Sequence, residues 1–289
     1  MRRFIAAVVA AGVLTVTADA QPQQTTANAA LRYWTAFAAL QDPPADPTTT
    51  DLLLRVADGN AAWDEGRLGA ILDANVEALD IMARASTLRS CDWGVEYELG
   101  PHAPIPHLAK ARVLGRLSVL SGMRLAARGQ TSEAVDRWLA SIRFSQHLAQ
   151  GGTLISLLSA QSILTPSLHA IANEVSRLNP DSRARIEIGL RALPATGFDW
   201  ADAMRREEGA LVAGVRIKAV PNLTAQDLPA LHTTVSQIAD ALSLPPDRAR
   251  TALAKVNLGS FPLPSPTRIN DQRETIRAAR QRVVDALAR

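Results

Sequence analysis

The sequence contains a single cysteine, Cys91, and only three lysines. One cysteine excludes an intramolecular disulfide, and a lone cysteine most often packs as a small apolar residue. Of 31 basic residues, 31 − 3 = 28 are arginines, an excess that reflects genome composition more often than nucleic-acid binding. The formal net charge of +3 produces too weak a field to predict a polyanionic partner.

Familiar catalytic motifs are also missing from the sequence. It contains no G-x-S-x-G elbow, S-x-x-K pair, H-E-x-x-H, Walker loop or G-x-G-x-x-G, and none of its five histidines precedes an acidic residue. These absences argue against the motif-bearing hydrolases and nucleotide enzymes. The sequence predicts no cofactor, no metal site and no nucleic-acid partner.

The first residues have the layout of a secretory signal peptide. A basic start at Arg2 and Arg3 precedes an uncharged apolar stretch, and Ala18 and Ala20 form a small-x-small cleavage pattern. The apolar stretch is shorter than the roughly 20 residues that a spanning helix needs. We therefore expect residues 1–20 to be removed, and the mature chain to reach the periplasm, the cell envelope or the exterior.

The mature chain reads as helix throughout, and 47% hydrophobic residues provide for a large core. We predict an all-α fold of roughly nine helices stacked as antiparallel hairpins, in one domain over 21–289 with a possible subdivision near 179–198. Helices are expected over 28–41, 61–88, 106–128, 131–150, 153–178, 180–193, 199–219, 224–244, 245–256 and 271–288.

Two segments interrupt this pattern. Three prolines within 43–47 predict a break between the first two helices. Between Val95 and Leu99, apolar and acidic residues alternate, which is typical of a short extended strand.

No charged residue occurs from Phe144 to Asn173. Length alone would permit a membrane span there. Glutamines, serines, two histidines and Pro166 make the segment costly in lipid, however. The pattern favours a central helix buried by its neighbours, with no transmembrane span in the mature chain.

The two helices expected around Gly129 resemble one tetratricopeptide-type hairpin. The resemblance is carried by the small, large, small and aromatic residues at Gly122, Leu125, Ala134 and Trp138. No second copy follows at a period of about 34 residues. The sequence departs from the repeat pattern at Ser118, Ser121, Ser141 and Gln146.

Residues 91–94, 106–112 and 151–156 resemble an uncharacterised family of exported bacterial helical proteins. The resemblance extends from about Leu31 to Ala172. It implies a helical fold and an envelope or periplasmic location, and it implies no activity.

The non-helical segment between the second and third long helices is the main candidate site. Thiol, imidazole and carboxylate groups in one loop could form a ligand-binding surface, hold a metal, or act as nucleophile and base. A structural role, with Cys91 and Trp93 in the core, is the alternative. The candidate residues are Cys91, Asp92, Trp93, Glu96, Glu98, His102 and His107.

A second candidate is a basic track on the third long helix, at Arg112, Arg116, Arg124 and Arg128. The spacing in multiples of four places these arginines near one face, where they could bind an acidic ligand. Pairing with Glu133, Asp136 or the loop carboxylates, or simple solvation, is the alternative.

These features favour an exported binding or scaffold module, with a protein or peptide as the expected partner. An enzyme that uses the Cys91–His107 loop and a structural component of the envelope are the alternatives. A concave groove between helices would favour binding. A pocket that unites Cys91, His102 and His107 would favour the enzyme.

Overall fold

A computed structural model describes residues 27–289 of the chain, so the predicted signal peptide lies outside the described residues. In this range the protein is all-helical, as predicted, with one isolated bridge between Asn28 and Ser90. Between residues 27 and 289 there are twelve α-helices, not roughly nine. They are α1 (Ala29–Ala39), α2 (Pro47–Ala57), α3 (Glu65–Asp73), α4 (Val76–Ala85), α5 (His107–Ala127), α6 (Thr131–Ala149), α7 (Leu154–Glu174), α8 (Pro180–Ala192), α9 (Trp200–Arg216), α10 (Leu228–Ser243), α11 (Pro246–Leu253) and α12 (Pro266–Leu287), with 3-10 turns η1 (Tyr97–Leu99), η2 (Val175–Arg177) and η3 (Ala225–Asp227).

One additional helix, α2, begins inside the predicted break. The Asp46 side chain accepts a hydrogen bond from the Thr49 backbone N–H at 2.8 Å, and Pro47 occupies the first turn. Proline is favoured in the first turn of a helix because the N–H that it lacks would have no partner there. The last of the three prolines therefore begins a helix.

A second additional helix arises because the expected helix over 61–88 is split at Asn75. This side chain is buried at 1% exposure, and it accepts from Gln41 N at 2.8 Å and donates to Gln41 O at 3.0 Å. The buried amide thus joins the turn between α3 and α4 to the end of α1. Directly after the break Val76 is 50% exposed, whereas Leu79 and Met82 further along α4 are buried.

Two smaller predictions were also wrong. The segment expected as a strand forms the 3-10 turn η1, with Glu96 and Glu98 exposed on either side of Tyr97. The last helix begins at Pro266, five residues before the expected start at Asp271, again with proline in the first turn.

Helices α5, α6 and α7 form the centre of the core, and each packs against the other two. A Cβ atom on Gly122 would lie 2.3 Å from Trp138 Nε1, so this glycine allows α5 and α6 to approach closely. The Ser141 hydroxyl donates to Ser118 Oγ at 2.8 Å across the same interface. Two of the serines that depart from the tetratricopeptide pattern therefore pair with each other.

Helix α7 carries most of the uncharged segment. With η2 it is long and apolar enough to cross a membrane, judged by length and composition alone, and 72% of its most apolar window is buried inside the protein. Pro166 lies within it and has no N–H to donate to the Ser162 carbonyl. The Ser162 carbonyl therefore lacks the hydrogen bond that the residue four positions later would donate in a regular helix.

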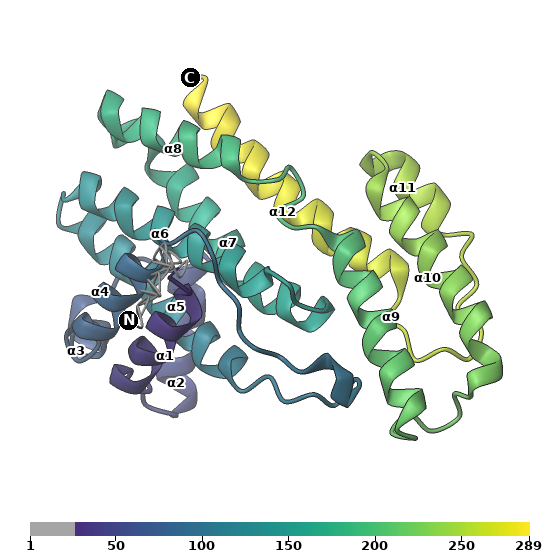
Figure 1. The fold of residues 1–289 in the computed structure, drawn as a ribbon. Helices are drawn as coiled ribbons and strands as arrows, with labels where there is room; N and C mark the ends of the chain where they lie inside the picture. Colours follow the sequence, from purple (N-terminus) through teal and green to yellow (C-terminus); the bar gives the residue numbers. More distant parts are fainter. Residues whose placement is uncertain (1–26) are drawn as a thin grey trace, which may run out of the picture.

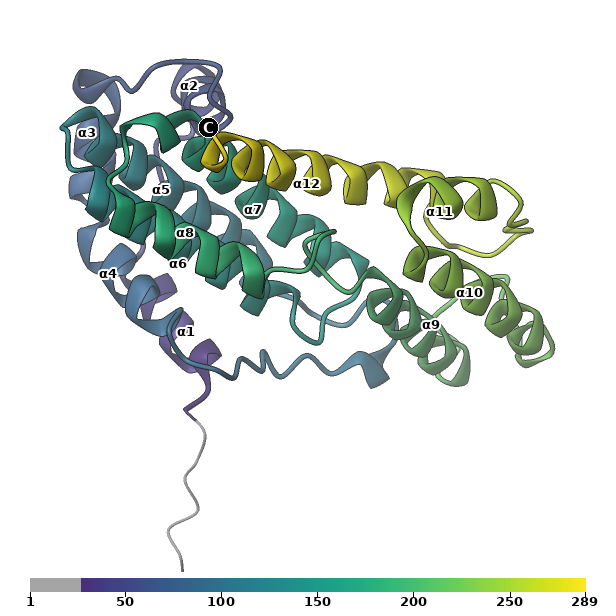
Figure 2. The same cartoon turned by 90° about the horizontal axis from the view of Figure 1, so that it is seen from above.

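The remaining helices extend this body at one end. Helices α9, α10 and α11 lie together beyond the end of α7, and α12 runs from α11 back along α7 (Figures 1 and 2). The loop after α4 also reaches this part, because η1 packs against α9. A Cβ atom on Gly100 would lie 2.9 Å from Gly214 Cα, so only a glycine permits this contact.

Candidate functional site

The Cys91–His107 loop encloses a cavity of about 340 Å³ against the turn between α6 and α7. Cys91, Asp92, Trp93 and His107 line it, together with Gly151 and Gly152 of that turn. Glu96, Glu98 and His102 are exposed and do not line it. The fold thus brings together four of the seven predicted residues, whereas the imidazole of His102 lies outside the cavity.

Aromatic contacts hold this loop to the body. The rings of Trp93 and His107 stack with centroids 4.4 Å apart, and Trp93 Nε1 donates to the His147 carbonyl at 2.9 Å. The Tyr33 hydroxyl lies 2.7 Å from His147 Nδ1, and its ring stacks on Trp93 at 5.6 Å. Trp93 is therefore an anchor between α1, α5 and α6.

The ionisation of the loop residues does not suit nucleophilic catalysis. Burial, with a smaller contribution from Asp92, raises the pKa of Cys91 to about 12, so the thiol is protonated at neutral pH. Burial lowers the pKa of His107 to about 4, so its imidazole is neutral. An activated cysteine has a lowered pKa beside a cationic partner. No group of three or more metal-ligating side chains occurs within residues 27–289.

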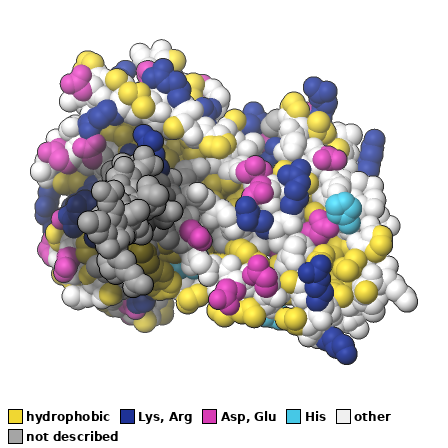
Figure 3. All heavy atoms as spheres, in the orientation of Figure 1, with side chains coloured by type: hydrophobic (Ala, Val, Ile, Leu, Met, Phe, Trp, Pro, Cys, Tyr) yellow, Lys and Arg dark blue, Asp and Glu magenta, His cyan; other side chains and the backbone are white. Residues whose placement is uncertain are grey.

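The predicted basic track does not form one surface. Arg124 forms ion pairs with Glu65 and with Asp73, and Arg128 pairs with Glu65 at 2.8 Å. The partners predicted from the sequence were wrong, because the acids come from α3, and Asp136 pairs with Arg185 of α8 instead. The face seen in Figure 3 likewise mixes acidic and basic side chains over its area.

Arg116, in contrast, lines a polar cavity of about 600 Å³ between α2, α5, α7 and α12, which we call the α7 cavity. Arg116 comes from α5, and Arg282 comes from the far end of the sequence on α12. Gln161, Thr165 and His169 follow one another at four-residue intervals along the α7 wall. This periodicity places all three on one face of the helix.

Positive charge exceeds negative charge in the α7 cavity. Arg116 is half-buried, and burial lowers its pKa while Asp58 opposes the shift. Arg282 Nη1 lies 3.5 Å from His169 Nε2, and burial followed by this guanidinium lowers the pKa of His169. At neutral pH the imidazole is uncharged. Two arginines and one aspartate therefore supply the charges of the lining, and of these Asp58 and Arg282 are exposed.

Two residues that line this cavity carry a buried polar atom without a partner. Gln161 is 7% exposed; its Nε2 donates to Gln272 Oε1 at 2.7 Å, but its Oε1 has no hydrogen-bond partner among the described residues. The hydroxyl of Thr165 is equally unpartnered there, although threonine in a helix commonly bonds a carbonyl four residues earlier. Both atoms are buried beneath the surface of the cavity.

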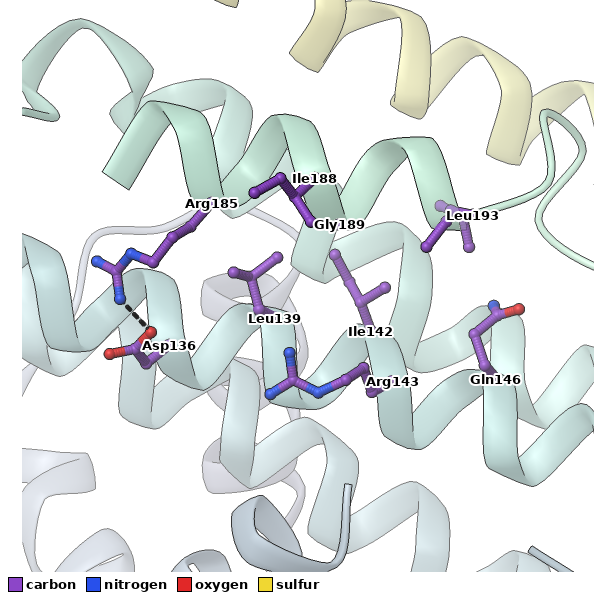
Figure 4. Close-up of a pocket in the computed structure, with 10 residues that line it drawn as sticks. Asp136, Leu139, Ile142, Arg143, Gln146, Arg185, Ile188, Gly189 and Leu193 are labelled. Atoms are coloured by element: carbon purple, nitrogen blue, oxygen red, sulfur yellow. Dashed lines mark hydrogen bonds and ion pairs between the residues drawn. The ribbon is translucent and has the colours of Figure 1, made fainter. Parts of the chain in front are cut away.

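A third concavity, of about 390 Å³, is the groove between α6 and α8 (Figure 4). Leu139 and Ile142 point from α6 toward α8, and the ion pair between Asp136 and Arg185 crosses one end. Ile188 is 61% exposed beside it. This groove is mainly apolar and was not predicted from the sequence.

Among the residues that define the α7 cavity, only Arg116 was predicted from the sequence as a site residue. A signal for the members on α7 is present: polar residues concentrate on an otherwise apolar core helix that also contains Pro166. The same residues argue against a membrane span. Their four-residue spacing additionally indicates a polar stripe inside the protein, and this is the signal that the prediction missed.

Comparisons of the chain with protein-family models, curated proteins and solved structures found no match. The function therefore has to be argued from the geometry of the described residues.

Proposed function

We propose that this protein is an exported helical binding protein and that a small ligand occupies the α7 cavity. The observation that carries the proposal is the polar lining of this cavity, where Arg116 of α5 and Arg282 of α12 join the polar face of α7. A cavity of about 600 Å³ has the size of small-molecule sites, in which a few polar groups orient the ligand against apolar walls.

The export part of the proposal is supported by the sequence of residues 1–20. We place the mature protein in the periplasm, in the cell envelope or outside the cell, with α7 as a core helix and not as a span. Stacked helical hairpins, with α5 and α6 as the tetratricopeptide-like pair, are the proposed scaffold around the site.

Binding accounts for the observations better than the two alternatives. An enzyme that uses the loop would need a reactive Cys91, and burial keeps this thiol protonated. A purely structural component does not require a cavity of about 600 Å³ lined by two arginines. The loop acts instead as a strap between α4 and α9, with Trp93 as its anchor.

A fragment screen by ligand-observed NMR tests the proposal. Ser162 is exposed at the wall of the α7 cavity, so Ser162→Trp should fill the space without disturbing the core. Ser176→Trp, on the exposed turn η2, is the matched control. We expect fragments that bind the wild type and the control to lose binding to Ser162→Trp. The proposal would be contradicted if the fragments bind all three proteins equally, or if no fragment binds any of them.

A peptide in the α6–α8 groove is a second candidate function, favoured by the 61% exposure of Ile188 beside Leu139 and Ile142. Apolar side chains of an extended peptide would cover these residues. Peptides selected by phage display should bind the wild type and fail to bind Ile188→Arg. Selected peptides that bind both proteins equally would remove this candidate.

A further inference from the structure

The α7 cavity combines cationic, hydrogen-bonding and apolar groups in an order that identifies a ligand class. Arg116 and Arg282 supply two positive charges, Asp58 supplies one negative charge, and His169 is neutral at pH 7 because burial lowers its pKa. The formal charge of the residues that line the cavity is therefore 2 − 1 = +1. A ligand with one negative charge would neutralise the site.

We propose that the ligand is an amphiphilic monoanion, with an oxyanion head such as a carboxylate between Arg116 and Arg282. This inference rests on the function proposed above. Guanidinium groups bind carboxylates with charge-assisted hydrogen bonds, and the partial burial of Arg116 strengthens the attraction. Neither arginine forms an ion pair with a carboxylate within the part of the chain that the structure describes.

The α7 wall adds polar residues beside the arginines. Gln161, Ser162, Thr165 and His169 line the cavity on this side, and His169 Nε2 lies 3.5 Å from Arg282 Nη1. A polar head group near Arg282 would therefore also lie near the imidazole of His169.

The apolar part of the ligand is indicated by two leucines that line the same cavity. Leu54 of α2 is 38% exposed and Leu158 of α7 is 43% exposed. A hydrocarbon chain that covers them removes apolar area from water at about 25 cal/mol per Å². A free inorganic anion would leave both leucines exposed, and this argues for an amphiphile.

Isothermal titration calorimetry with octanoate, 1-octanol and octylammonium separates charge from chain. These probes share a chain of the same length and differ in the charge of the head group. We expect octanoate to bind more tightly than the other two. Octanol or octylammonium binding as tightly as octanoate would overturn the monoanion while leaving the cavity as a binding site.

Variants of the arginines test whether octanoate binds in the α7 cavity. Arg116→Gln and Arg282→Gln should each weaken it by about 10-fold or more, since each removes a charge-assisted hydrogen bond to the head group. Arg112→Gln is the matched control, because Arg112 is exposed on the same helix and does not line the cavity. We expect it to bind as the wild type does, and circular dichroism verifies that each variant is folded.

Equal loss in all three variants, or no loss in any, would overturn the inference. If none of the three probes binds the wild type, the inference also fails. The fragment screen with Ser162→Trp then decides on the proposed function by itself, because it does not depend on the charge of the fragment.

Discussion

The indole of Trp93 and the imidazole of His107 are nearly parallel, with an angle of 7° between the rings and 4.4 Å between their centroids. The contact joins the loop after α4 to the first turn of α5. Trp93 also donates to the His147 carbonyl, so the loop is held to α6 as well. These contacts define a structural role for the loop.

Replacing Trp93 by alanine should therefore destabilise the whole protein. We expect a loss of about 3 kcal/mol in the free energy of unfolding, at the low end for a buried aromatic because Trp93 is half-buried. Urea denaturation followed by circular dichroism measures it. Trp34→Ala is the control: this tryptophan is 40% exposed and should cost less than half as much. Equal losses would show that Trp93 is not an anchor.

Stability should fall as the pH drops from about 6.5 toward 4. Burial lowers the pKa of His107 from its ordinary 6.5 to about 4, so the unfolded chain binds a proton in this range that the folded protein does not bind. Stability rises with pH wherever the unfolded state binds more protons, so this contribution is complete above pH 6.5 and lost by pH 4.

The measurement is the free energy of unfolding in urea at a series of pH values. His107→Gln should flatten the slope between pH 6.5 and 4 relative to the wild type. It should not alter the fall below pH 4, where carboxylates such as Glu65, whose pKa is held at about 2 by Arg124, become protonated. An unchanged slope in the variant would assign the effect to other groups.

Cys91 should resist alkylation in the native protein. Its pKa of about 12 leaves far less thiolate at pH 8 than a free cysteine has, and the side chain is 3% exposed. We expect labelling by iodoacetamide to be more than ~100-fold slower in buffer than in urea, with mass spectrometry as the readout. Rapid labelling of the folded protein would revive the enzyme hypothesis.

Gly122→Ala should separate α5 from α6. The new Cβ atom would overlap Trp138, and overpacking of this kind costs about 1–3 kcal/mol. Gly209→Ala is the matched control within a helix: a Cβ atom there would meet no other atom within 4 Å, and alanine should stabilise α9 by up to about 1 kcal/mol. Thermal unfolding should shift in opposite directions. Similar shifts would contradict the close approach at Gly122.

The sequence was sufficient to predict the fold class and the central helices, because α5, α6 and α7 follow long apolar patterns that end at Gly129 and Gly151. It was insufficient where one side chain overrides a pattern. Asn75 divides the helix expected over 61–88 because its amide bonds the backbone of Gln41, and Pro47 starts a helix within a segment whose prolines predicted a break. Both effects depend on local hydrogen bonds that periodicity does not encode.

The site was harder to predict for a different reason. Cys91 and His107 drew attention by residue type, but burial makes both unreactive. Arg116 and Arg282 are far apart in the sequence, and only the path of α12 brings them to one cavity. Two residues that meet only through the tertiary fold have no characteristic spacing in the sequence, so their shared site could not be predicted.

The position of α12 has a consequence in time. Its buried residues Ile276, Ala279 and Val283 are synthesised after α8 to α11, and α12 packs along α7. Until they leave the ribosome, one side of the central helix has nothing to cover it. The native packing of α7 is thus completed only after the five helices that follow it have been made.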